Sequence, residues 1–464
     1  MIKLYNSLSQ RKETFKPRKS GQINIFVCGP TVYDFSHIGH AKTYIFFDSL
    51  VKYLLQEKNK IFYLQNITDI DDKIINRSRE QNITPKNLAL KFEKEYLNDM
   101  ENLRVNSVTK YARATDYIKE IISQVERLLK KELAYLIDDG IYFNTKAFKE
   151  YGKLSKRTAL QAQDSVSRID TTLGKINRGD FCLWKFSKKG EPSWPSVWGQ
   201  GRPGWHVEDT AITEKFFGPQ YDIHGGGRDL IFPHHEAEIA QMEGISNKKP
   251  LAKFWLHTGF LTVNGEKMSK SLGNFITIRD FLQKDSGRIL RLFALKSHYR
   301  SPIDYSEKNI SQVKKELEKI DEVILRLKKI PAKCKNGKEA GALIKSTDKE
   351  FFTAIENDFN SVLAIASLFK LLNKANKLID QNKLGAKQAK LILKFFDKID
   401  KFLDFIFWQK EIQKIPAKIL AKIRERKKAR SEQNWPKSDE LRKEIEIMGY
   451  KLEDVDGETI VKSI

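Results

Sequence analysis

Residues 23–44 read INIFVCGPTVYDFSHIGHAKTY, an apolar run followed by a glycine-containing loop and a long helical pattern. The apolar residues 23–28 predict a buried strand, and the pattern from about 37 to 56 predicts a helix. A strand that runs through a loop into a helix is the first half of a β-α-β unit with parallel strands. Ligands of such folds gather at the carboxyl ends of the strands, so this loop is the first candidate for a site.

The alternation of strand and helix continues after this unit. KIFYLQNIT at 60–68 predicts a second strand that runs into an acidic turn and a helix. Thr84 and Pro85 have the residue types of a helix cap and a first-turn proline, so another helix begins there. The order of these elements favours a Rossmann-type parallel sheet.

An interruption divides the predicted sheet. Between about 120 and 200 the alternation lapses, and three tryptophans at 184, 194 and 198 lie among glycines and prolines. The pattern resumes with a strand YDIHGGG at 221–227, a helix FPHHEAEIAQ at 232–241 and a strand KFWLHTGFLTV at 253–263. We therefore expect an α/β fold whose Rossmann-type catalytic domain comprises 1–120 and 200–265, split by a connective insertion at 121–199.

The second half of the chain is predicted to be helical. One apolar stripe at helical spacing begins after residue 307 and comprises Val313, Leu317, Ile320, Val323, Ile324 and Leu327. PAKCKNGKEAG at 331–341 has the composition of a linker. We expect a loop and linking helices at 266–306, a helical bundle at 307–410, and a small basic domain at 411–464.

Composition limits the compartment and the partners. Lysine and arginine number 83 against 60 acidic residues, a formal charge of +23, which suits a nucleic acid partner or a merely lysine-rich soluble surface. Three cysteines predict no disulfide framework and point to a reducing compartment. No run approaches the ~18 to 20 apolar residues of a membrane span. The start, MIKLYNSLSQRKETF, has no apolar signal-peptide core, so we expect a cytoplasmic protein without a membrane partner.

Residues 234–238 concentrate possible metal ligands. His234 and Glu238 are four residues apart, so on a helix they would share one face and could hold one ion. The zinc-protease pattern H-E-x-x-H is excluded, because Ile239 stands where its second histidine is required. A solvated, acidic helix start is the alternative interpretation.

Two other stretches suit phosphates. His37 and His40 lie one turn apart at a predicted helix start, where free N–H groups favour anions, and Gly39 lets a nucleotide approach the backbone. Lys267 and Lys270 lie in VNGEKMSKSLGN at 263–274, a glycine-bounded loop that could close over a triphosphate. Each pair alone could be solvated surface.

Together, HIGH at 37–40 and KMSKS at 267–271 resemble the two signatures of class I aminoacyl-tRNA synthetases. Further stretches resemble the cysteinyl-tRNA synthetase family: FVCGPTVYD, NITDIDDKI, GRPGWHVED, HGGGRDLIFPHHEAEIAQ and HYRSPIDYS, with WPKSDELR and LEDVDGET in the tail. The resemblance covers nearly the whole chain. It implies a ligase that joins L-cysteine and ATP into cysteinyl-adenylate and pyrophosphate, and then transfers cysteine to the 3′ end of tRNA(Cys).

The resemblance also implies roles for the phosphate motifs. His37, His40, Lys267 and Lys270 would stabilise charge that develops on the phosphates of ATP. Gly227 and Asp229 match the family's G-x-D element, whose carboxylate accepts hydrogen bonds from ribose hydroxyls. Magnesium (Mg2+) is expected to accompany ATP.

In the resembled family, a zinc ion (Zn2+) in the amino acid pocket is held by two cysteines, a histidine and a glutamate. The matching positions are Cys28, Asp209, His234 and Glu238, so this chain has aspartate at one cysteine position. Zinc binds a thiolate well and a hydroxyl poorly, which would reject serine. Aspartate is also a zinc ligand, but Asp209 could instead turn away and leave the ion weakly held, replaced or absent.

Around this ion, the resemblance places the substrate. The residues expected to contact cysteine are Cys28, Gly29, Thr68, Trp205, His206 and His224. Any one of the last three could be ordinary packing.

The tail suits RNA. Residues 414–430 carry eight basic residues against the single acid Glu425, which favours phosphate contact. The residues expected to read the anticodon are Arg430, Trp435, Asp439 and Asp454. A ligase that transfers cysteine to a small amine would not need such a tail, and an inactive RNA-binding paralogue would be expected to lose HIGH or KMSKS. We expect a monomer.

Overall fold

The computed structural model describes residues 1–157, 174–269, 272–331, 338–408, 417–448, 450–455 and 458–463. The chain forms two compact units, Met1–Phe407 and Trp408–Ile464. The first unit contains the sheet that the sequence predicts, and the second is small.

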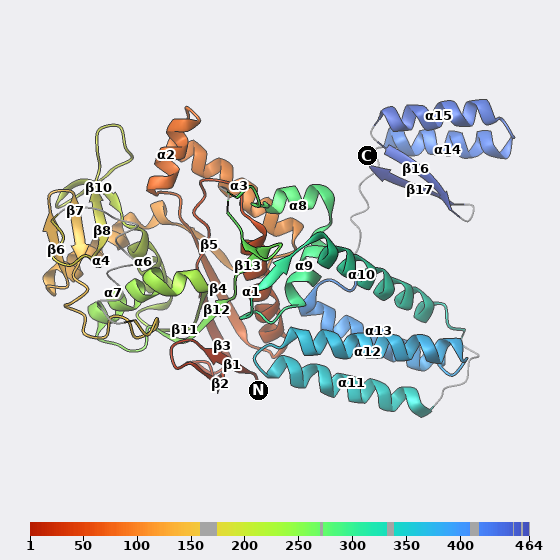
Figure 1. The fold of residues 1–464 in the computed structure, drawn as a ribbon, viewed down its shortest axis with the longest axis horizontal. Coiled ribbons are helices and arrows are strands. Elements are labelled where there is room, and N and C mark those ends of the chain that lie inside the picture. The colour runs from red at the N-terminus through yellow and green to blue at the C-terminus, as the bar shows by residue number, and fades with distance from the viewer. Residues whose placement is uncertain are drawn as a thin grey trace. The chain divides into compact units, whose positions relative to one another are not determined.

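A parallel five-stranded sheet lies at the centre of the first unit (Figure 1). Its order is β12-β11-β3-β4-β5, and every neighbouring pair is parallel. The strands are β3 (Gln22–Val27), β4 (Lys60–Ile67), β5 (Lys110–Arg113), β11 (Tyr221–Gly227) and β12 (Ala252–Thr258). After β3 the chain adds β4 and β5 on one side, and later β11 and β12 on the other. The order therefore reverses between β3 and β11, where open α/β sheets bind ligands beyond the carboxyl ends of their strands.

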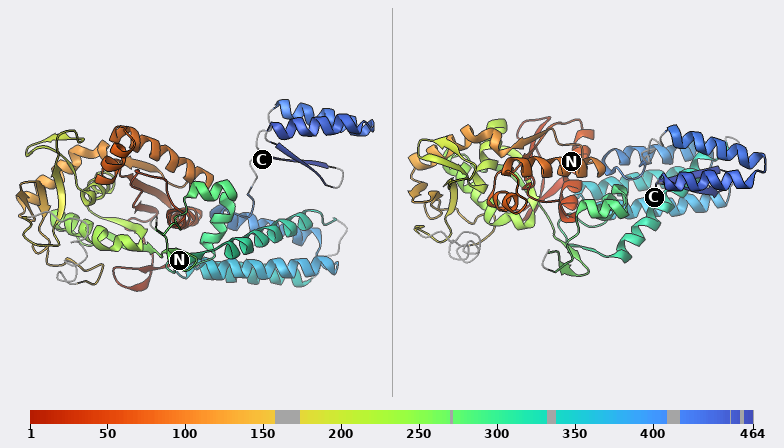
Figure 2. Two further views of the ribbon diagram at one scale, coloured as in Figure 1. Left: turned by 45° about the horizontal axis from the view of Figure 1, so that its top comes forward. Right: turned by 90° about the horizontal axis from the view of Figure 1, so that it is seen from above.

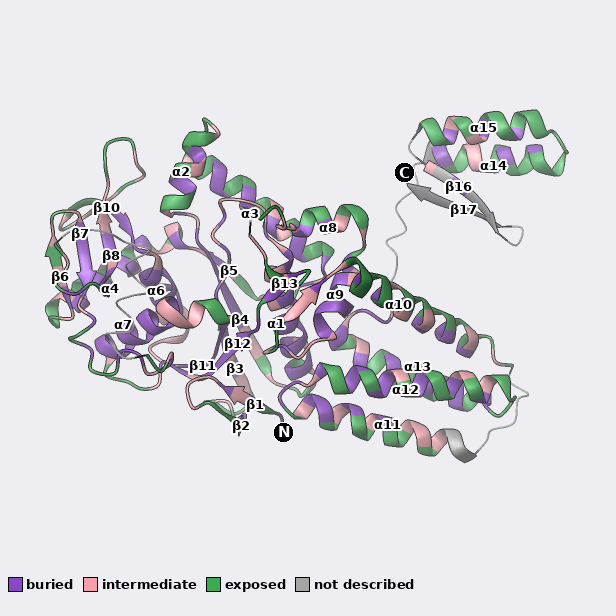
Figure 3. Cartoon of the chain, viewed as in Figure 1, coloured by how far each residue is buried: buried purple, intermediate pink, exposed green. Residues whose placement is uncertain are grey.

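Three helices follow the first strands. They are α1 (Ile38–Gln56), α2 (Asp72–Glu80) and α3 (Pro85–Asn102). Thr84 caps α3 through its side chain and Pro85 occupies the first turn, as predicted. His37 caps α1, and the buried side of α1 packs on the sheet, whose strands β11 and β12 are drawn almost wholly as buried in Figure 3.

The interrupting segment forms a sheet of its own, which the sequence did not predict. Helix α4 (Ile118–Lys130) precedes an antiparallel sheet of order β6-β7-β8-β10-β9, and α6 (Trp205–Phe217) leads back to β11. The strands are β6 (Ala134–Ile137), β7 (Gly140–Phe143), β8 (Phe181–Phe186), β9 (Trp194–Ser196) and β10 (Gly199–Pro203). Trp184 is fully buried in this sheet. Figure 2 shows this antiparallel sheet on one side of the central parallel sheet and the helices α10 to α13 on the other side.

Two predicted elements are wrong in their bounds. The predicted strand at 253–263 is two strands: β12 ends at Thr258, and β13 (Leu261–Val263) belongs to a separate sheet with β14 (Glu266–Lys267) and β15 (Ile303–Tyr305). The helix predicted at 232–241 is a π-helical turn, Ile231–His235, that runs into α7 (Glu236–Ser246) and so ends five residues later than predicted. Within the turn, Phe232 has extended φ/ψ of −137° and 132°, as a residue before proline prefers.

The rest of the first unit is helical, apart from an N-terminal hairpin of β1 (Lys3–Asn6) and β2 (Arg11–Thr14). The helices are α8 (Ile278–Lys284), α9 (Gly287–Leu295), α10 (Glu307–Lys328), α11 (Lys338–Glu356), α12 (Ser361–Asp380) and α13 (Ala386–Leu403). All six residues of the predicted stripe on α10 are buried. Helix α11 already begins within the predicted linker.

The second unit pairs two helices with a hairpin. Its elements are α14 (Ala417–Ser431), α15 (Trp435–Ile447), β16 (Tyr450–Val455) and β17 (Glu458–Ser463). Ile419, Ile445 and Leu452 form its small apolar core. Among the described residues of the whole chain, no helix has the length and apolar character that a membrane span requires.

Candidate active site

Four separate segments bring possible metal ligands to the carboxyl edge of the sheet. Cys28 directly follows β3, Asp209 lies in α6, His234 lies in the turn before α7, and Glu238 lies in the first turn of α7. This is the edge where the strand order reverses. One ligand atom from each of the four residues lies within 4.8 Å of the others, and all four side chains are buried.

The carboxylate of Asp209 points into this group. Its Oδ2 lies 3.0 Å from His234 Nε2 and 3.4 Å from Cys28 Sγ. Glu238 Oε1 lies 2.9 Å from the same His234 nitrogen and 3.9 Å from Cys28 Sγ. The spacing of four residues between His234 and Glu238 therefore places both on one side of the group, although the helix begins only at Glu236.

A second group shares two of these residues. Cys28, His224, His235 and Glu238 also bring their ligand atoms within 4.8 Å of one another. His235 Nε2 lies 3.1 Å from Cys28 Sγ, and His224 Nε2 lies 3.1 Å from Glu238 Oε2. Sequence reasoning assigned no role to His235, although it stands beside His234 in the same motif.

Burial and the charges of neighbouring groups shift the pKa values of the side chains in this site. Burial raises the pKa of the Cys28 thiol, and the neighbouring carboxylates of Glu238 and Asp209 raise it further. Burial likewise raises the pKa of Glu238 to about 8. Burial lowers the pKa of His234, but Glu238 and Asp209 outweigh it and bring the value to about 10. Buried acids that oppose each other's ionisation in this way suit a dication, which stabilises their deprotonated forms.

Two carboxylate oxygens of the site, Asp209 Oδ1 and Glu238 Oε2, have no hydrogen-bond partner among the described residues. Asp209 Oδ1 is buried and accepts no hydrogen bond from the described part of the chain. An unsatisfied buried carboxylate oxygen is costly, and a cation would satisfy it. The donor set of thiolate, imidazole and two carboxylates therefore fits zinc.

Other side chains hold the ligands in place. His206 Nδ1 lies 2.8 Å from His234 Nδ1, and the Trp205 ring stacks on His234 at a centroid distance of 4.3 Å. Tyr221 Oη lies 2.7 Å from His224 Nδ1. A partner on the second ring nitrogen fixes the tautomer and orientation of a ligating histidine. The predicted substrate residues Trp205, His206 and His224 thus contact the ligand group or belong to it.

Gly29 and Thr68 lie on the neighbouring strand ends. The Gly29 N–H donates to Asn66 Oδ1 at 2.6 Å, and a side chain at Gly29 would collide with the Asn66 carbonyl. The Thr68 hydroxyl donates to Glu208, which also accepts from Asn66 Nδ2 at 3.4 Å. Sequence reasoning missed Asn66 and Glu208. Both stand in motifs that carry the resemblance, but nothing in their spacing distinguishes them from packing.

The two imidazoles at the start of α1 are hydrogen-bond donors. The backbone N–H groups of Gly39 and His40 donate to His37 Nδ1 at 3.1 and 3.3 Å, and the His37 N–H donates to His40 Nδ1 at 3.3 Å. Burial lowers the pKa of His37 to about 4 and that of His40 well below its usual range. Both rings are therefore neutral at pH 7 with the proton on Nε2, which leaves each with one free donor.

The segment that contains the KMSKS motif lies against this helix start. The Ile38 N–H donates to the Ile276 carbonyl at 3.1 Å, and the Ile278 N–H donates to the Ser36 carbonyl at 2.8 Å. The Met268 side chain lies close to Gly39, since a Cβ added there would come within 3.7 Å of its Cε. The two motifs, more than two hundred residues apart in sequence, are thus neighbours.

The structure describes all but one of the remaining residues predicted to bind the nucleotide. Lys267, on β14, is exposed, and Lys270 lies outside the described residues. Gly227 ends β11, and the exposed Asp229 follows in the turn Arg228–Leu230. The Asp229 carboxylate lies beside Gly227, where a Cβ would come within 2.4 Å of Oδ1. An exposed carboxylate at this edge of the sheet is available to a ribose.

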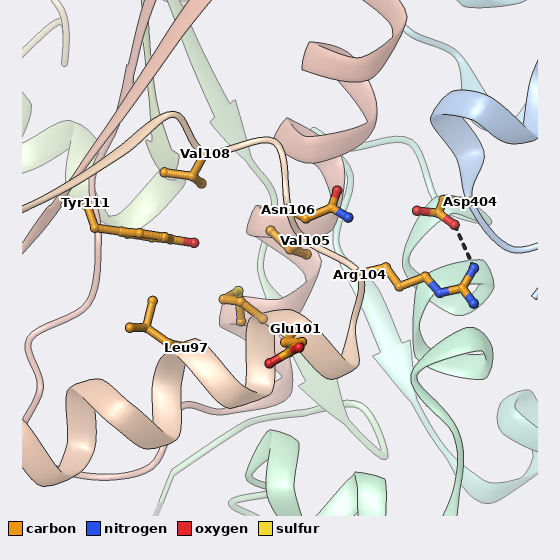
Figure 4. A pocket seen from close by; sticks show the side chains of 9 residues that line it. Leu97, Glu101, Arg104, Val105, Asn106, Val108, Tyr111 and Asp404 are labelled. Atoms are coloured by element: carbon orange, nitrogen blue, oxygen red, sulfur yellow. Dashed lines mark hydrogen bonds and ion pairs between the residues drawn. The ribbon is translucent and has the colours of Figure 1, made fainter. Parts of the chain in front are cut away.

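A cavity of about 650 Å³ lies away from these residues (Figure 4). It has an apolar floor and a polar rim that includes the ion pair of Arg104 and Asp404, with 3.1 Å between Nη1 and Oδ1. Its lining residues are Leu97, Met100, Glu101, Arg104, Val105, Asn106, Val108, Tyr111 and Asp404. It contains none of the predicted site residues.

The second unit exposes three of the predicted RNA contacts. The Arg430 guanidinium lies 6.0 Å from the centroid of the Trp435 ring, which is 56% exposed. Asp439 is exposed on α15. Asp454 lies on β16, opposite Thr459, and its side chain is outside the described residues.

The chain matches known proteins over nearly its whole length. Residues 14–315 match the family model of the class I (C) tRNA synthetase catalytic domain, and residues 350–407 match the DALR domain. A cysteine–tRNA ligase of Thermoplasma volcanium is 45% identical over 453 residues, 97% of each chain. One of Thermococcus onnurineus is 41% identical over 477 residues, covering 100% of this chain and 99% of the relative.

Solved structures share the fold at low identity. Methionyl-tRNA synthetase of Mycobacterium tuberculosis, in complex with methionyl-adenylate, has a TM-score of 0.59 and 15% identity over 83% of this chain and 88% of that chain. The leucyl enzyme of Agrobacterium radiobacter in its ternary complex with tRNA has a TM-score of 0.60 and 12% identity over 84% and 85%.

Proposed function

Because the chain belongs to the cysteine–tRNA ligase family of class I aminoacyl-tRNA synthetases and is therefore an ATP-dependent ligase, we propose that Cys28, Asp209, His234 and Glu238 hold a zinc ion that selects cysteine. The observation that carries this proposal is the inward carboxylate of Asp209, whose Oδ1 has no partner among the described residues. Its charge replaces that of the cysteine found at this position in the resembled family, so three anionic ligands would still surround the ion.

When bound, zinc would supply a strong preference for a thiolate over a hydroxyl, and with it rejection of serine. The protein's own residues hold the pocket in shape. Trp205 and His206 orient the His234 ring, and Tyr221 orients His224. Thr68 and Asn66 fix Glu208 beside the group, which keeps this buried acid hydrogen bonded.

The phosphates of ATP would lie at the start of α1. We propose that the Nε2–H groups of His37 and His40 donate to phosphate oxygens as their charge grows, while Lys267 and Lys270 supply positive charge from the facing segment. Gly39 leaves room for the nucleotide, and Gly227 and Asp229 would hold the ribose. Magnesium would accompany the triphosphate. None of these groups acts as a nucleophile.

The alternative set of His224 and His235 with Cys28 and Glu238 would hold an ion without Asp209. One feature favours the first set. His235 Nδ1 and His224 Nδ1 have partners in His257 and Tyr221, at 2.8 and 2.7 Å, just as His234 Nδ1 has one in His206 at 2.8 Å, so the ring partners do not separate the two sets. Without a cation, Asp209 Oδ1 would remain unsatisfied.

The test is metal analysis of the purified protein together with pyrophosphate exchange using cysteine, serine and methionine. Asp209→Ala is expected to lower zinc occupancy and to weaken rejection of serine, whereas Asp209→Cys is expected to retain zinc more firmly against a chelator. Asp222→Ala is the matched control, because Asp222 is a buried aspartate of β11 that accepts from the Asn24 N–H at 2.8 Å. Unchanged zinc and unchanged serine rejection in Asp209→Ala would contradict the proposal.

We propose further that Arg430, Trp435, Asp439 and Asp454 contact the anticodon of tRNA(Cys), supported by an exposed aromatic ring beside a cation on a separate unit. The proposed working state is a cytoplasmic monomer. Sedimentation of the purified protein tests the oligomeric state.

A further inference from the structure

Lys42 is a buried lysine in the helix that carries His37 and His40. Its side chain is 3% exposed, and its ammonium donates to three backbone carbonyls: Ser301 at 2.6 Å, Gly259 at 2.8 Å and Phe260 at 3.5 Å. An ammonium has three N–H donors, so these carbonyls satisfy it. Arg228, a group of like charge, is the charged neighbour that affects it, and no carboxylate contacts it among the described residues.

This lysine is costly to bury. Burial, and then the charge of Arg228, lower its pKa to about 7. An apolar side chain would fill the same space without that cost, but it would leave the three carbonyls without this donor.

Two of the carbonyls, those of Gly259 and Phe260, belong to the corner where the chain leaves the parallel sheet, and that of Ser301 belongs to the returning chain before β15. Strand β12 ends at Thr258, and after Gly259 and Phe260 the chain enters β13, which continues into β14 with Lys267. The corner packs tightly on the returning chain, because a Cβ at Gly259 would come within 2.4 Å of the Ser301 carbonyl. Thr43 adds a second link, with its hydroxyl 2.7 Å from that of Thr258.

The far end of the same segment is also fixed to α1. Ile276 and Ile278 exchange backbone hydrogen bonds with Ile38 and Ser36 at 3.1 and 2.8 Å. The segment that carries Lys267 is therefore attached to the first turns of α1 at both ends: by the backbone at 276–278 and by Lys42 at 259–260.

We propose that Lys42 is a positioning residue for adenylate formation, which holds the corner at Gly259 and so sets the place of β13, β14 and Lys267 relative to His37 and His40. The proposal rests on the proposed roles of those three residues toward ATP. Groups that act on one transition state must be held within a fraction of an ångström, and a displacement of about 1 Å can cost about 10²-fold in rate.

The experiment compares Lys42→Met with the full-length wild type in pyrophosphate exchange. The expected result is a fall in kcat of about 10²-fold, with the KM for cysteine and the zinc content unchanged. Lys42→Arg, which keeps a cation with several donors, is expected to recover part of the loss. Lys52→Met is the matched control: Lys52 lies on the same helix, pairs with Asp48 and Asp404 at 2.9 Å, and should leave exchange unchanged.

A double-mutant cycle distinguishes the proposed positioning role of Lys42 from a general loss of stability. In a Lys267→Ala background, Lys42→Met is expected to cost little more, because the group that it positions is already absent. Additive losses, a fully active Lys42→Met, or an equal rise in the KM for cysteine would overturn the proposal. A fully active Lys267→Ala would instead overturn the proposed role of the segment. If Lys42→Met does not fold, Gly259→Ala displaces the same corner and is expected to give the same kinetic pattern.

Discussion

At the scale of single residues, a substitution of His40 tests the proposed phosphate site. The Nδ1 of His40 accepts from the backbone, so Nε2–H is the group that can reach a phosphate. His40→Ala and Lys267→Ala are each expected to lower the rate of adenylate formation by roughly 10²- to 10³-fold. Lys284→Ala, an exposed lysine of α8, is the matched control for Lys267. Full exchange activity in either site variant would remove that residue from the mechanism.

His257 links the buried histidines to the pH dependence of stability. It is 3% exposed, contacts His235 and Ser7 at 2.8 and 2.7 Å, and has a pKa lowered to about 3 by burial and then by Arg228. The unfolded chain binds a proton at a pKa of about 6.5, so this histidine's contribution is present in full above that pH and is lost as the pH falls toward about 3.

From pH 7 to pH 5, the contribution of His257 to the free energy of unfolding falls by about 2 kcal/mol. The free energy of unfolding should therefore fall less in His257→Gln than in the wild type between these two pH values. Denaturant unfolding of both proteins at pH 7 and pH 5 measures the difference. Contributions that the two proteins share, including any loss of metal, cancel in the comparison. An identical loss in both proteins would show that folding does not lower the pKa of His257.

At single positions, the sequence could identify the residues that belong to motifs but not the partners that tune them. Cys28, His234 and Glu238 stand out by type and spacing, and the structure places them together with Asp209. The role of His235 depends on its two contacts, Cys28 Sγ at Nε2 and His257 at Nδ1, which its place beside His234 in the chain does not reveal. Asn66 and Glu208 meet only through the fold.

At the scale of elements, periodicity predicted the strands and helices that run straight, and failed where the chain turns without a polar signal. The apolar pattern of 253–263 continues through Gly259, yet the tight approach of Ser301 there turns the chain into a second sheet. Pro233 suggested a helix start, but its effect is on Phe232, which it keeps extended. The antiparallel sheet of the insertion has short strands with irregular alternation, so no period marked it.

Three helices and a loop meet at a buried arginine. Arg291 of α9 is fully buried and donates to Asp48 of α1 at 2.5 Å, to the Leu403 carbonyl at 2.8 Å and to the Leu103 carbonyl at 3.0 Å. Arg291→Met would leave the Asp48 carboxylate buried without this partner, so it is expected to lower the free energy of unfolding by about 3 kcal/mol or more.

The control for Arg291 is an exposed pair on a neighbouring helix. Arg326 of α10 pairs with Asp380, which is 62% exposed, and Arg326→Met should cost at most about 1 kcal/mol. Adding Asp48→Asn to Arg291→Met should recover part of the stability, because the buried carboxylate that has lost Arg291 is then replaced by a neutral group. Equal effects of Arg291→Met and Arg326→Met in denaturant unfolding would show that the buried arginine contributes no more than a surface one.

At the scale of the whole molecule, the first unit is complete at Phe407. Asp400 accepts the backbone N–H groups of Phe405, Ile406 and Phe407 at 2.8, 2.6 and 2.8 Å, and Arg288 donates to the Phe405 carbonyl at 2.7 Å. These bonds fix the last residues of the unit without help from the tail. The proposed contacts with ATP and cysteine lie on the first unit and the proposed contacts with tRNA lie on the second, so truncation can separate them.

A chain that ends at Phe407 is expected to keep zinc and to form adenylate at the wild-type rate, because all residues proposed for those steps lie in the first unit. The truncated chain lacks the basic residues of α14, Arg430 among them, and it lacks Trp435. One base stacked on an aromatic ring contributes about 1 to 3 kcal/mol to binding. Charging of tRNA, as kcat/KM, should therefore fall by roughly 10²-fold or more. In the full-length chain, Trp435→Ala should produce a part of that loss, and Ser431→Ala, an exposed residue of α14, should produce none. Charging that persists unchanged in the truncated chain would show that the anticodon is not read by this unit, whereas lost adenylate formation would show that the first unit is not complete.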